Sequence, residues 1–144
     1  MLKSLYWRLN FFFKNRKSKR LKKRLGNNSS TLTVNTKNGT FVIDPADLEV
    51  SRKLAVKGEY GTEEIIQISK FIDNKSTVLI VGAHIGSLAI PIAKLCSELV
   101  AIEANPNNFK LLETNIKLNN ISNILAHNIA AVSYTHLRAH ETKA

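Results

Sequence analysis

Two glycines and one glutamate carry the strongest chemical signal in the sequence. Gly82 and Gly86 follow the apolar run 78–81 and come just before a second apolar stretch. Because glycine has no Cβ, a turn bounded by glycines lets a ligand approach the backbone closely. Glu103 ends the next apolar run, 21 residues after Gly82, and a carboxylate there can accept hydrogen bonds from both hydroxyls of a ribose. Both places are predicted to lie at the carboxyl ends of neighbouring strands, where open α/β sheets bind ligands.

The spacing of the glycines bears on the class of ligand. Dinucleotide sites use the pattern G-x-G-x-x-G, which holds a pyrophosphate at a helix N-terminus. This chain has G-x-x-x-G, with Ala83 and His84 after the first glycine. The looser spacing favours an adenosine ligand without phosphates, S-adenosylmethionine, over NAD. A tight turn without any ligand stays open as an alternative, as does a plain helix N-terminal role for Glu103 ahead of Asn105-Pro106.

The elements that must position these residues follow an α/β order. We expect strands that alternate with helices of about ten residues, which indicates βαβ units and a parallel sheet. A hairpin should precede them, with Asn38-Gly39 at the centre of a type I′ turn. Pro91 predicts that its helix starts late or bends. The expected elements are strands 31–36 and 40–44, helix 63–72, strand 77–81, helix 87–95, strand 99–102, helix 107–118 and strand 124–127.

The formal charge of +10 belongs to one end of the chain. Residues 1–25 hold ten of the 21 Lys and Arg and no acid, so the remainder is neutral. Apolar residues among 1–13 recur at helical spacing, which predicts either a face that packs on the domain or a helix on anionic lipid. RNA binding ranks lower, since the basic run lacks interleaved aromatic residues for stacking. The single cysteine, Cys96, excludes an internal disulfide and is expected to be a buried apolar residue.

Several pieces together resemble the first half of the FkbM family of S-adenosylmethionine-dependent methyltransferases. They are Val81-Gly-Ala-His-Ile-Gly86, Ala101-Ile-Glu-Ala-Asn-Pro106, and the stretches 108–115 and 118–120. These are similar to the family's D-V-G-A-N-x-G turn, its E-P-N-P strand end, and its F-x-x-L-x-x-N helix leading into N-N. The resemblance implies a Rossmann-like class I methyltransferase fold with a parallel sheet, preceded by the hairpin and a basic N-terminal helix. It also implies that the sheet is truncated after about its third core strand.

The resemblance implies a set of cofactor-binding residues, and two of its positions depart from the family pattern. The methionine side of S-adenosylmethionine would meet the turn, the ribose would meet the acidic strand end, and the adenine would lie beside the residues that follow. Ile80 replaces the family's aspartate and His84 replaces its asparagine, where the imidazole could supply a hydrogen bond instead. The expected cofactor-binding residues are Gly82, Ala83, His84, Gly86, Glu103, Ala104, Asn105 and Asn128.

The function that the resemblance implies is O-methylation of a sugar or secondary metabolite. The partner would be a small-molecule hydroxyl acceptor in the cytoplasm, with nucleic acid not expected and membrane-surface contact through 1–25 left open. No catalytic residue and no metal ligand is assigned in this half. The alternatives are an NAD-binding oxidoreductase fragment and a non-catalytic module that binds membrane surfaces or nucleic acid through its basic segment.

Four segments divide the chain under this interpretation. They are the basic segment 1–29, the hairpin and lead-in helix 30–76, the first half of the methyltransferase domain 77–132, and the tail 133–144. The tail resembles translated sequencing adapter, so we expect it to be non-native. Its rival interpretation is a terminal helix in which His136, His140 and Glu141 bind a metal.

Overall fold

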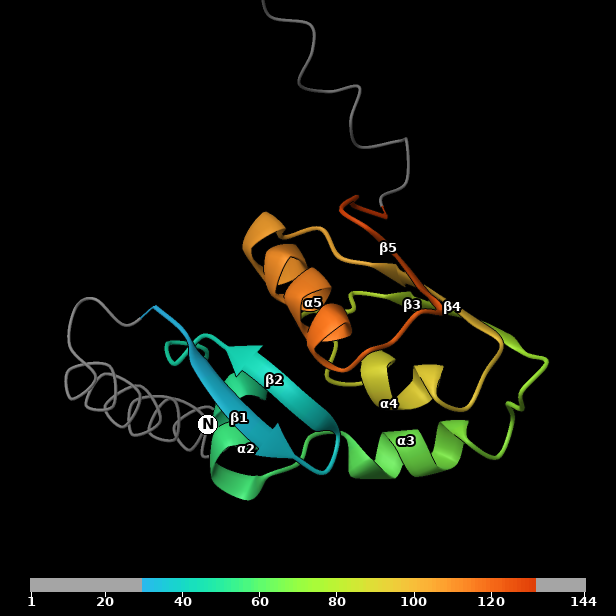
Figure 1. Ribbon diagram of the computed structural model, residues 1–144, viewed down its shortest axis with the longest axis horizontal. Coiled ribbons are helices and arrows are strands. Elements are labelled where there is room, and N and C mark those ends of the chain that lie inside the picture. The colour runs from blue at the N-terminus through green and yellow to red at the C-terminus, as the bar shows by residue number, and fades with distance from the viewer. Residues whose placement is uncertain (1–29, 132–144) are drawn as a thin grey trace, which may run out of the picture.

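A computed structural model describes residues 30–131, so the predictions for 1–29 and 133–144 lie outside the described residues. The fold is α/β, as expected, with an antiparallel hairpin ahead of a parallel sheet (Figure 1). The elements in chain order are β1 (Leu32–Thr36), β2 (Gly39–Ile43), α2 (Val50–Lys57), α3 (Thr62–Ile68), β3 (Thr77–Val81), α4 (Ala89–Ala93), β4 (Glu98–Ile102), α5 (Pro106–Leu118) and β5 (Ile124–His127).

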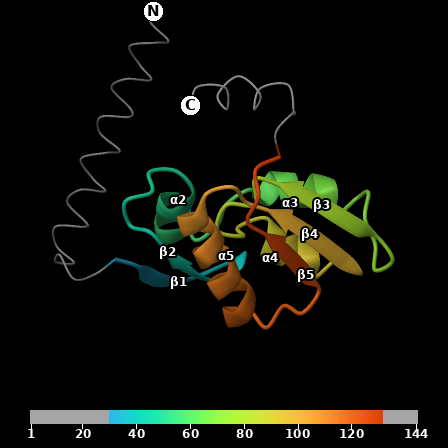
Figure 2. The ribbon, with the colours of Figure 1, turned by 90° about the horizontal axis from the view of Figure 1, so that it is seen from above.

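The parallel sheet has the order β3-β4-β5 and is covered on one face. The register places Val78, Leu99 and Ile124 in one row on the covered face, where side chains of α3, α4 and α5 join the same core cluster. The row of Leu79, Val100 and Leu125 lies on the opposite face. Leu79 and Leu125 are exposed there, so within 30–131 this face lacks a covering layer. Figure 2 shows α5 between the hairpin and the sheet.

The hairpin forms where it was expected, but its loop differs by one residue. Thr36 pairs with Gly39, so the two-residue loop is Lys37-Asn38, and the predicted type I′ turn centred on Asn38-Gly39 is wrong. Neither loop residue has the positive φ that a type I′ turn requires. Gly39 instead opens β2 with a φ of +134°, and a Cβ there would collide with the Asn119 side chain. The glycine therefore serves a close approach between the hairpin and α5.

Asn115 of α5 and Asn119, its C-cap residue, bind the free edge of β2 through their side-chain amides. Asn119 accepts from Thr40 N at 2.9 Å and donates to Thr40 O at 2.6 Å. Asn115 likewise accepts from Val42 N at 2.7 Å and donates to Val42 O at 3.1 Å. The spacings agree, since four helical residues rise about 6 Å and two strand residues span roughly 6.7 Å. The amides thus take the place of a third hairpin strand.

Three helices bear on the prediction in different ways. Helix α2 was missed by the sequence analysis. Asp47 accepts hydrogen bonds from Glu49 N and Ser51 N at its start, and Gly58 ends it with a left-handed φ of +70°. Helix α3 stops at Ile68, short of the predicted 72. Helix α4 starts late, as Pro91 predicted. It begins at Ala89, which puts the proline in the first turn, where the backbone N–H has no partner within the helix and its absence costs no hydrogen bond.

Candidate functional site

The turn after β3 is tied to the end of β4 by backbone hydrogen bonds. Gly82 N and Ala83 N both donate to Ile102 O, at 2.8 Å and 2.9 Å. Gly82 and Gly86 have φ values of +82° and +90°, which favour glycine. A Cβ on Gly86 would lie 2.9 Å from Leu112 Cδ1, so that glycine serves packing. A Cβ on Gly82 would meet nothing within 4 Å, so Gly82 borders open space where a ligand fits.

The Glu103 carboxylate holds the turn and the start of α5 together. Its Oε2 accepts from His84 N at 2.7 Å, and its Oε1 accepts from Asn105 N at 2.8 Å. Glu103 is only 7% exposed. A carboxylate offers about four acceptor positions, so two remain for the hydroxyls of a ribose. The structure therefore gives Glu103 a structural role and leaves it the capacity for the predicted binding role.

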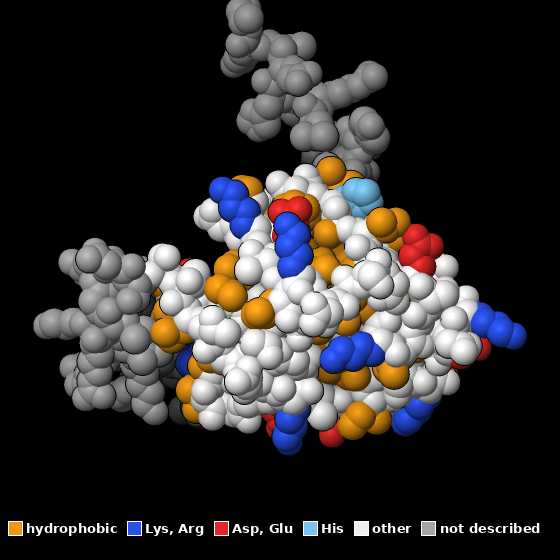
Figure 3. Space-filling model, in the orientation of Figure 1, with side chains coloured by type: hydrophobic (Ala, Val, Ile, Leu, Met, Phe, Trp, Pro, Cys, Tyr) orange, Lys and Arg blue, Asp and Glu red, His pale blue; other side chains and the backbone are white. Residues whose placement is uncertain are grey.

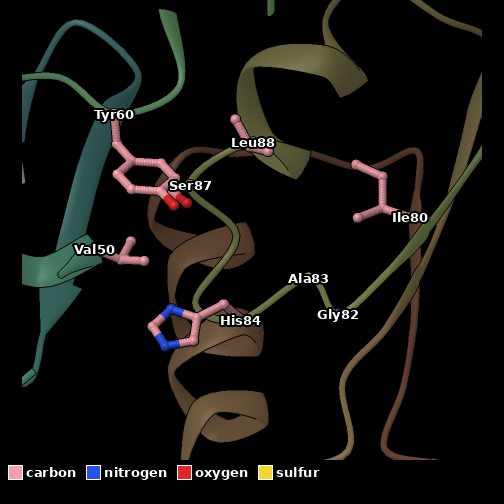
Figure 4. Close-up of a pocket in the computed structure, with 8 residues that line it drawn as sticks. All are labelled: Val50, Tyr60, Ile80, Gly82, Ala83, His84, Ser87 and Leu88. Carbon is pink, nitrogen blue, oxygen red and sulfur yellow. The ribbon is translucent and has the colours of Figure 1, made fainter. Parts of the chain in front are cut away.

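His84 has two features that set it apart in the turn. Its φ of +53° lies in the left-handed region, which costs a histidine about 1 kcal/mol, and the bond from its N–H to Glu103 offsets that strain. Its Nδ1 is buried without a hydrogen-bond partner among the described residues. Figure 4 shows the imidazole pointing toward Val50 and away from Gly82. A buried ring nitrogen without a partner needs an explanation, and a bound water or a polar ligand atom would each supply one.

A small cavity lies between the lead-in elements and the glycine turn (Figure 4). Its volume is about 90 Å³, well below the roughly 300–1,000 Å³ of pockets that enclose a whole drug-sized ligand. It can hold one end of a cofactor, while the rest would extend along the carboxyl edge of the sheet toward Glu103. The lining residues are Val50, Tyr60, Ile80, Gly82, Ala83, His84, Ser87 and Leu88.

The remaining predicted residues gather beyond Glu103. Asn105 Oδ1 accepts from Asn107 N and Asn108 N as the N-cap of α5, so its oxygen is already engaged. Asn128 Nδ2 donates to Glu103 O at 2.8 Å and to Ala104 O at 3.2 Å. All the predicted cofactor residues therefore lie at one edge of the sheet, with Ala104 exposed. Contacts of Ala104, Asn105 and Asn128 with an adenine stay predictions.

Sequence reasoning missed the lead-in side of this site. Val50 and Tyr60 line the cavity from segments that precede the sheet. Tyr60 lies between Gly58 and Gly61, which both have a left-handed φ, and this pair of glycines is a signal that could have marked its segment as a tight turn. Val50 belongs to the missed helix α2, so no pattern pointed to it.

Other candidate chemistry is absent from the part of the chain that the structure describes. Burial raises the pKa of the Cys96 thiol, so it stays protonated at neutral pH and is a poor nucleophile. Within 30–131 no three His, Cys, Asp or Glu side chains are grouped to hold a metal ion. No helix in this range is long and apolar enough to cross a membrane.

A comparison with protein families decides between kinds of methyltransferase. Residues 33–138 match the model of the TRM5/TYW2 methyltransferase domain, which covers most of the chain. The chain belongs to this family. The expected FkbM membership is therefore wrong, and so is the small-molecule hydroxyl acceptor taken from it. The NAD-binding oxidoreductase alternative finds no support in a methyltransferase family.

Solved structures agree with the TRM5/TYW2 assignment. Trm5b from Pyrococcus abyssi is 27% identical over 70% of this chain and 28% of its own, with a TM-score of 0.55. TYW2 from M. jannaschii, solved with AdoMet, is 25% identical over 73% of this chain and 45% of its own, with a TM-score of 0.58. At the level of the fold alone, aTrm5 in complex with tRNALeu is similar too, at 23% identity over 75% of this chain and 31% of its own, with a TM-score of 0.56. No curated protein matches the chain.

These relatives correct the predicted class of partner and support the predicted cofactor. The chain spans less than half the length of each of the three. The TYW2 relative holds AdoMet, so S-adenosylmethionine is confirmed as a cofactor of TRM5/TYW2 proteins. The expectation against a nucleic-acid partner accompanied the FkbM resemblance and is wrong with it, because the family is TRM5/TYW2. One neighbour in fold, aTrm5, was solved in complex with tRNALeu.

Proposed function

We propose that this chain is the S-adenosylmethionine-binding part of a tRNA-modifying methyltransferase of the TRM5/TYW2 type. The observation that carries the proposal is the family match across 33–138, which includes both the glycine turn and Glu103. The buried carboxylate with two free acceptor positions and the open space at Gly82 supply the geometry for the cofactor.

The cofactor would lie along the carboxyl edge of the sheet. The ribose hydroxyls would donate to Glu103, and the methionine end would enter the cavity beside Gly82, where His84 Nδ1 has no partner among the described residues. When bound, S-adenosylmethionine supplies a methyl group on a positively charged sulfur. The role of this part of the chain is to bind and orient that group, which lowers the entropic cost of the transfer step.

A substitution at Gly82 tests cofactor binding directly. In Gly82→Ala the methyl group would point into the space proposed for the cofactor, and we expect the Kd for S-adenosylmethionine to rise at least tenfold by isothermal titration calorimetry. Stability should fall by only about 1–2 kcal/mol, the cost of a left-handed alanine. Gly58→Ala is the matched control, because Gly58 has a φ of +70° and equally open surroundings.

The two glycine variants separate strain from obstruction. Gly58→Ala should lose about the same stability and keep the wild-type Kd. Equal affinity in the two variants would show that no cofactor lies against Gly82. A wild-type chain that binds no S-adenosylmethionine would contradict the proposed function itself.

The basic N-terminal segment is our candidate for the tRNA contact. Residues 1–25 hold ten Lys and Arg and no acid, whereas the rest of the chain is neutral. Figure 3 shows Lys and Arg scattered singly over one face of the described body, with no basic patch on it. Phosphate contacts need positive charge and not stacking, so the lack of aromatics in the basic run does not argue against them.

Deleting residues 1–25 should weaken tRNA binding at least tenfold in 0.1 M salt. The plot of log K against log salt concentration should also become shallower. Each phosphate that is no longer neutralised reduces the magnitude of its slope by about 0.9. Filter binding across a salt series measures both quantities. S-adenosylmethionine affinity serves as the control and should stay unchanged. An unaltered salt slope would assign the tRNA contact to another part of the protein.

A further inference from the structure

Two buried asparagines hold the carbonyl groups on either side of Gly86. Asn115 Nδ2 donates to Ile85 O at 2.9 Å, and Asn38 Nδ2 donates to Ser87 O at 3.0 Å. Asn115 comes from α5 and Asn38 from the hairpin loop, so two separate elements fix the end of the glycine turn. Both side chains are buried, at 0% and 4% exposure.

The Asn38 amide also binds both backbone groups of Tyr60. Its Nδ2 donates to Tyr60 O at 2.6 Å, and its Oδ1 accepts from Tyr60 N at 3.1 Å. Tyr60 and Ser87 both line the cavity beside the turn (Figure 4). One side chain therefore joins two segments that line the cavity, although its own residue lies outside the cavity lining.

The chemistry of the amide explains why this position needs asparagine. Three backbone groups converge on the side chain, two carbonyls that need donors and one N–H that needs an acceptor. An amide supplies both kinds of group in one short side chain, whereas an ionised carboxylate only accepts and an alanine supplies neither.

We propose that Asn38 is a positioning residue for S-adenosylmethionine, which sets the separation of Tyr60 and Ser87 and thereby preorganises the glycine turn. This inference rests on the proposed function, since it concerns the same cofactor. A turn that is already held in its binding geometry costs the ligand less on binding. The hairpin thus contributes to cofactor affinity without touching the cofactor.

The test compares Asn38→Asp and Asn38→Ala with Asn123→Ala in the full chain. Asn123 is the matched control, because its Nδ2 also donates to backbone carbonyls, those of Ala93 and Cys96. It lies just before β5, at the amino end of the parallel sheet, whereas the glycine turn lies at the carboxyl end. Kd for S-adenosylmethionine is measured by calorimetry under conditions where urea titration shows every variant to be folded. Hydrogen exchange at Gly86 and Ile90 reports on the order of the turn, because the Gly86 amide donates to Ala83 O and the Ile90 amide donates to Gly86 O.

We expect both Asn38 variants to raise the Kd at least tenfold and to speed exchange at the two amides. Asn123→Ala should lose stability but stay within twofold of the wild-type Kd. The inference is overturned if the Asn38 variants bind as the wild type does, or if Asn123→Ala weakens binding equally. A wild-type chain that binds no S-adenosylmethionine defeats the proposed function and this inference together, whereas wild-type binding with unaffected Asn38 variants defeats the inference alone.

Discussion

Replacing Glu103 with glutamine should weaken S-adenosylmethionine binding by about 1–3 kcal/mol, a 5- to 150-fold rise in Kd, because the charged hydrogen bonds to the ribose are removed. The same change should destabilise the fold by about 2 kcal/mol. The two carboxylate oxygens accept from His84 N and Asn105 N, and an amide can accept at only one of its ends. Its NH₂ group would face the other backbone N–H, so one buried donor would be left unpaired.

Glu98→Gln is the control for this prediction. Glu98 begins the same strand, β4, but is exposed at the opposite end, so its neutralisation should change both quantities little. Calorimetry gives the affinity and urea unfolding gives the stability. If Glu103→Gln lost stability yet bound S-adenosylmethionine normally, Glu103 would be a structural residue and the ribose would lie elsewhere.

The second large effect is expected at Asn115, where alanine should cost about 3–5 kcal/mol of unfolding free energy. The side chain is fully buried and satisfies Val42 N, Val42 O and Ile85 O. Each buried polar group left without a partner costs about 1–3 kcal/mol. Urea unfolding should show a lower midpoint with an unchanged slope.

Asn107→Ala provides the comparison on the same helix, since Asn107 is exposed and its replacement should stay within about 0.5 kcal/mol. A loss at Asn115 no larger than at Asn107 would mean that water replaces the amide between α5 and β2. The hairpin would then depend on its apolar contacts and on the hydrogen bonds of Asn38 and Asn119.

The strands could be predicted well because their apolar and β-branched side chains reflect how far each strand is buried. Strand 124–127 forms as predicted, and β3 lies at the expected 77–81. The order of strands and helices then placed Gly82 and Glu103 at one edge of the sheet. What the sequence could not show was the structural role of Glu103, because the left-handed backbone of His84 that brings its N–H to the carboxylate arises from the folded turn.

The misassigned family has a physical explanation as well. The FkbM resemblance was based on the glycine turn, the acidic strand end and the Asn-Pro start of α5, which are features expected of a cofactor site, and the family match shows that they did not identify the family. Features that bind the substrate decide between a metabolite and a tRNA. The glycine turn and the strand ends after it carry none of them. The lack of aromatics within the basic run 14–25 speaks only against stacking on single-stranded bases, whereas contacts to a phosphate backbone need only charge.

The amides that bind β2 also have a consequence for solubility. An exposed strand edge is a template on which another chain can add a strand, which leads to aggregation or domain swapping. Asn115 and Asn119 occupy the N–H and C=O groups of Val42 and Thr40 on the edge that β1 leaves open. The two side chains that anchor the hairpin therefore also occupy the groups at Thr40 and Val42 with which an intermolecular strand would pair on that side.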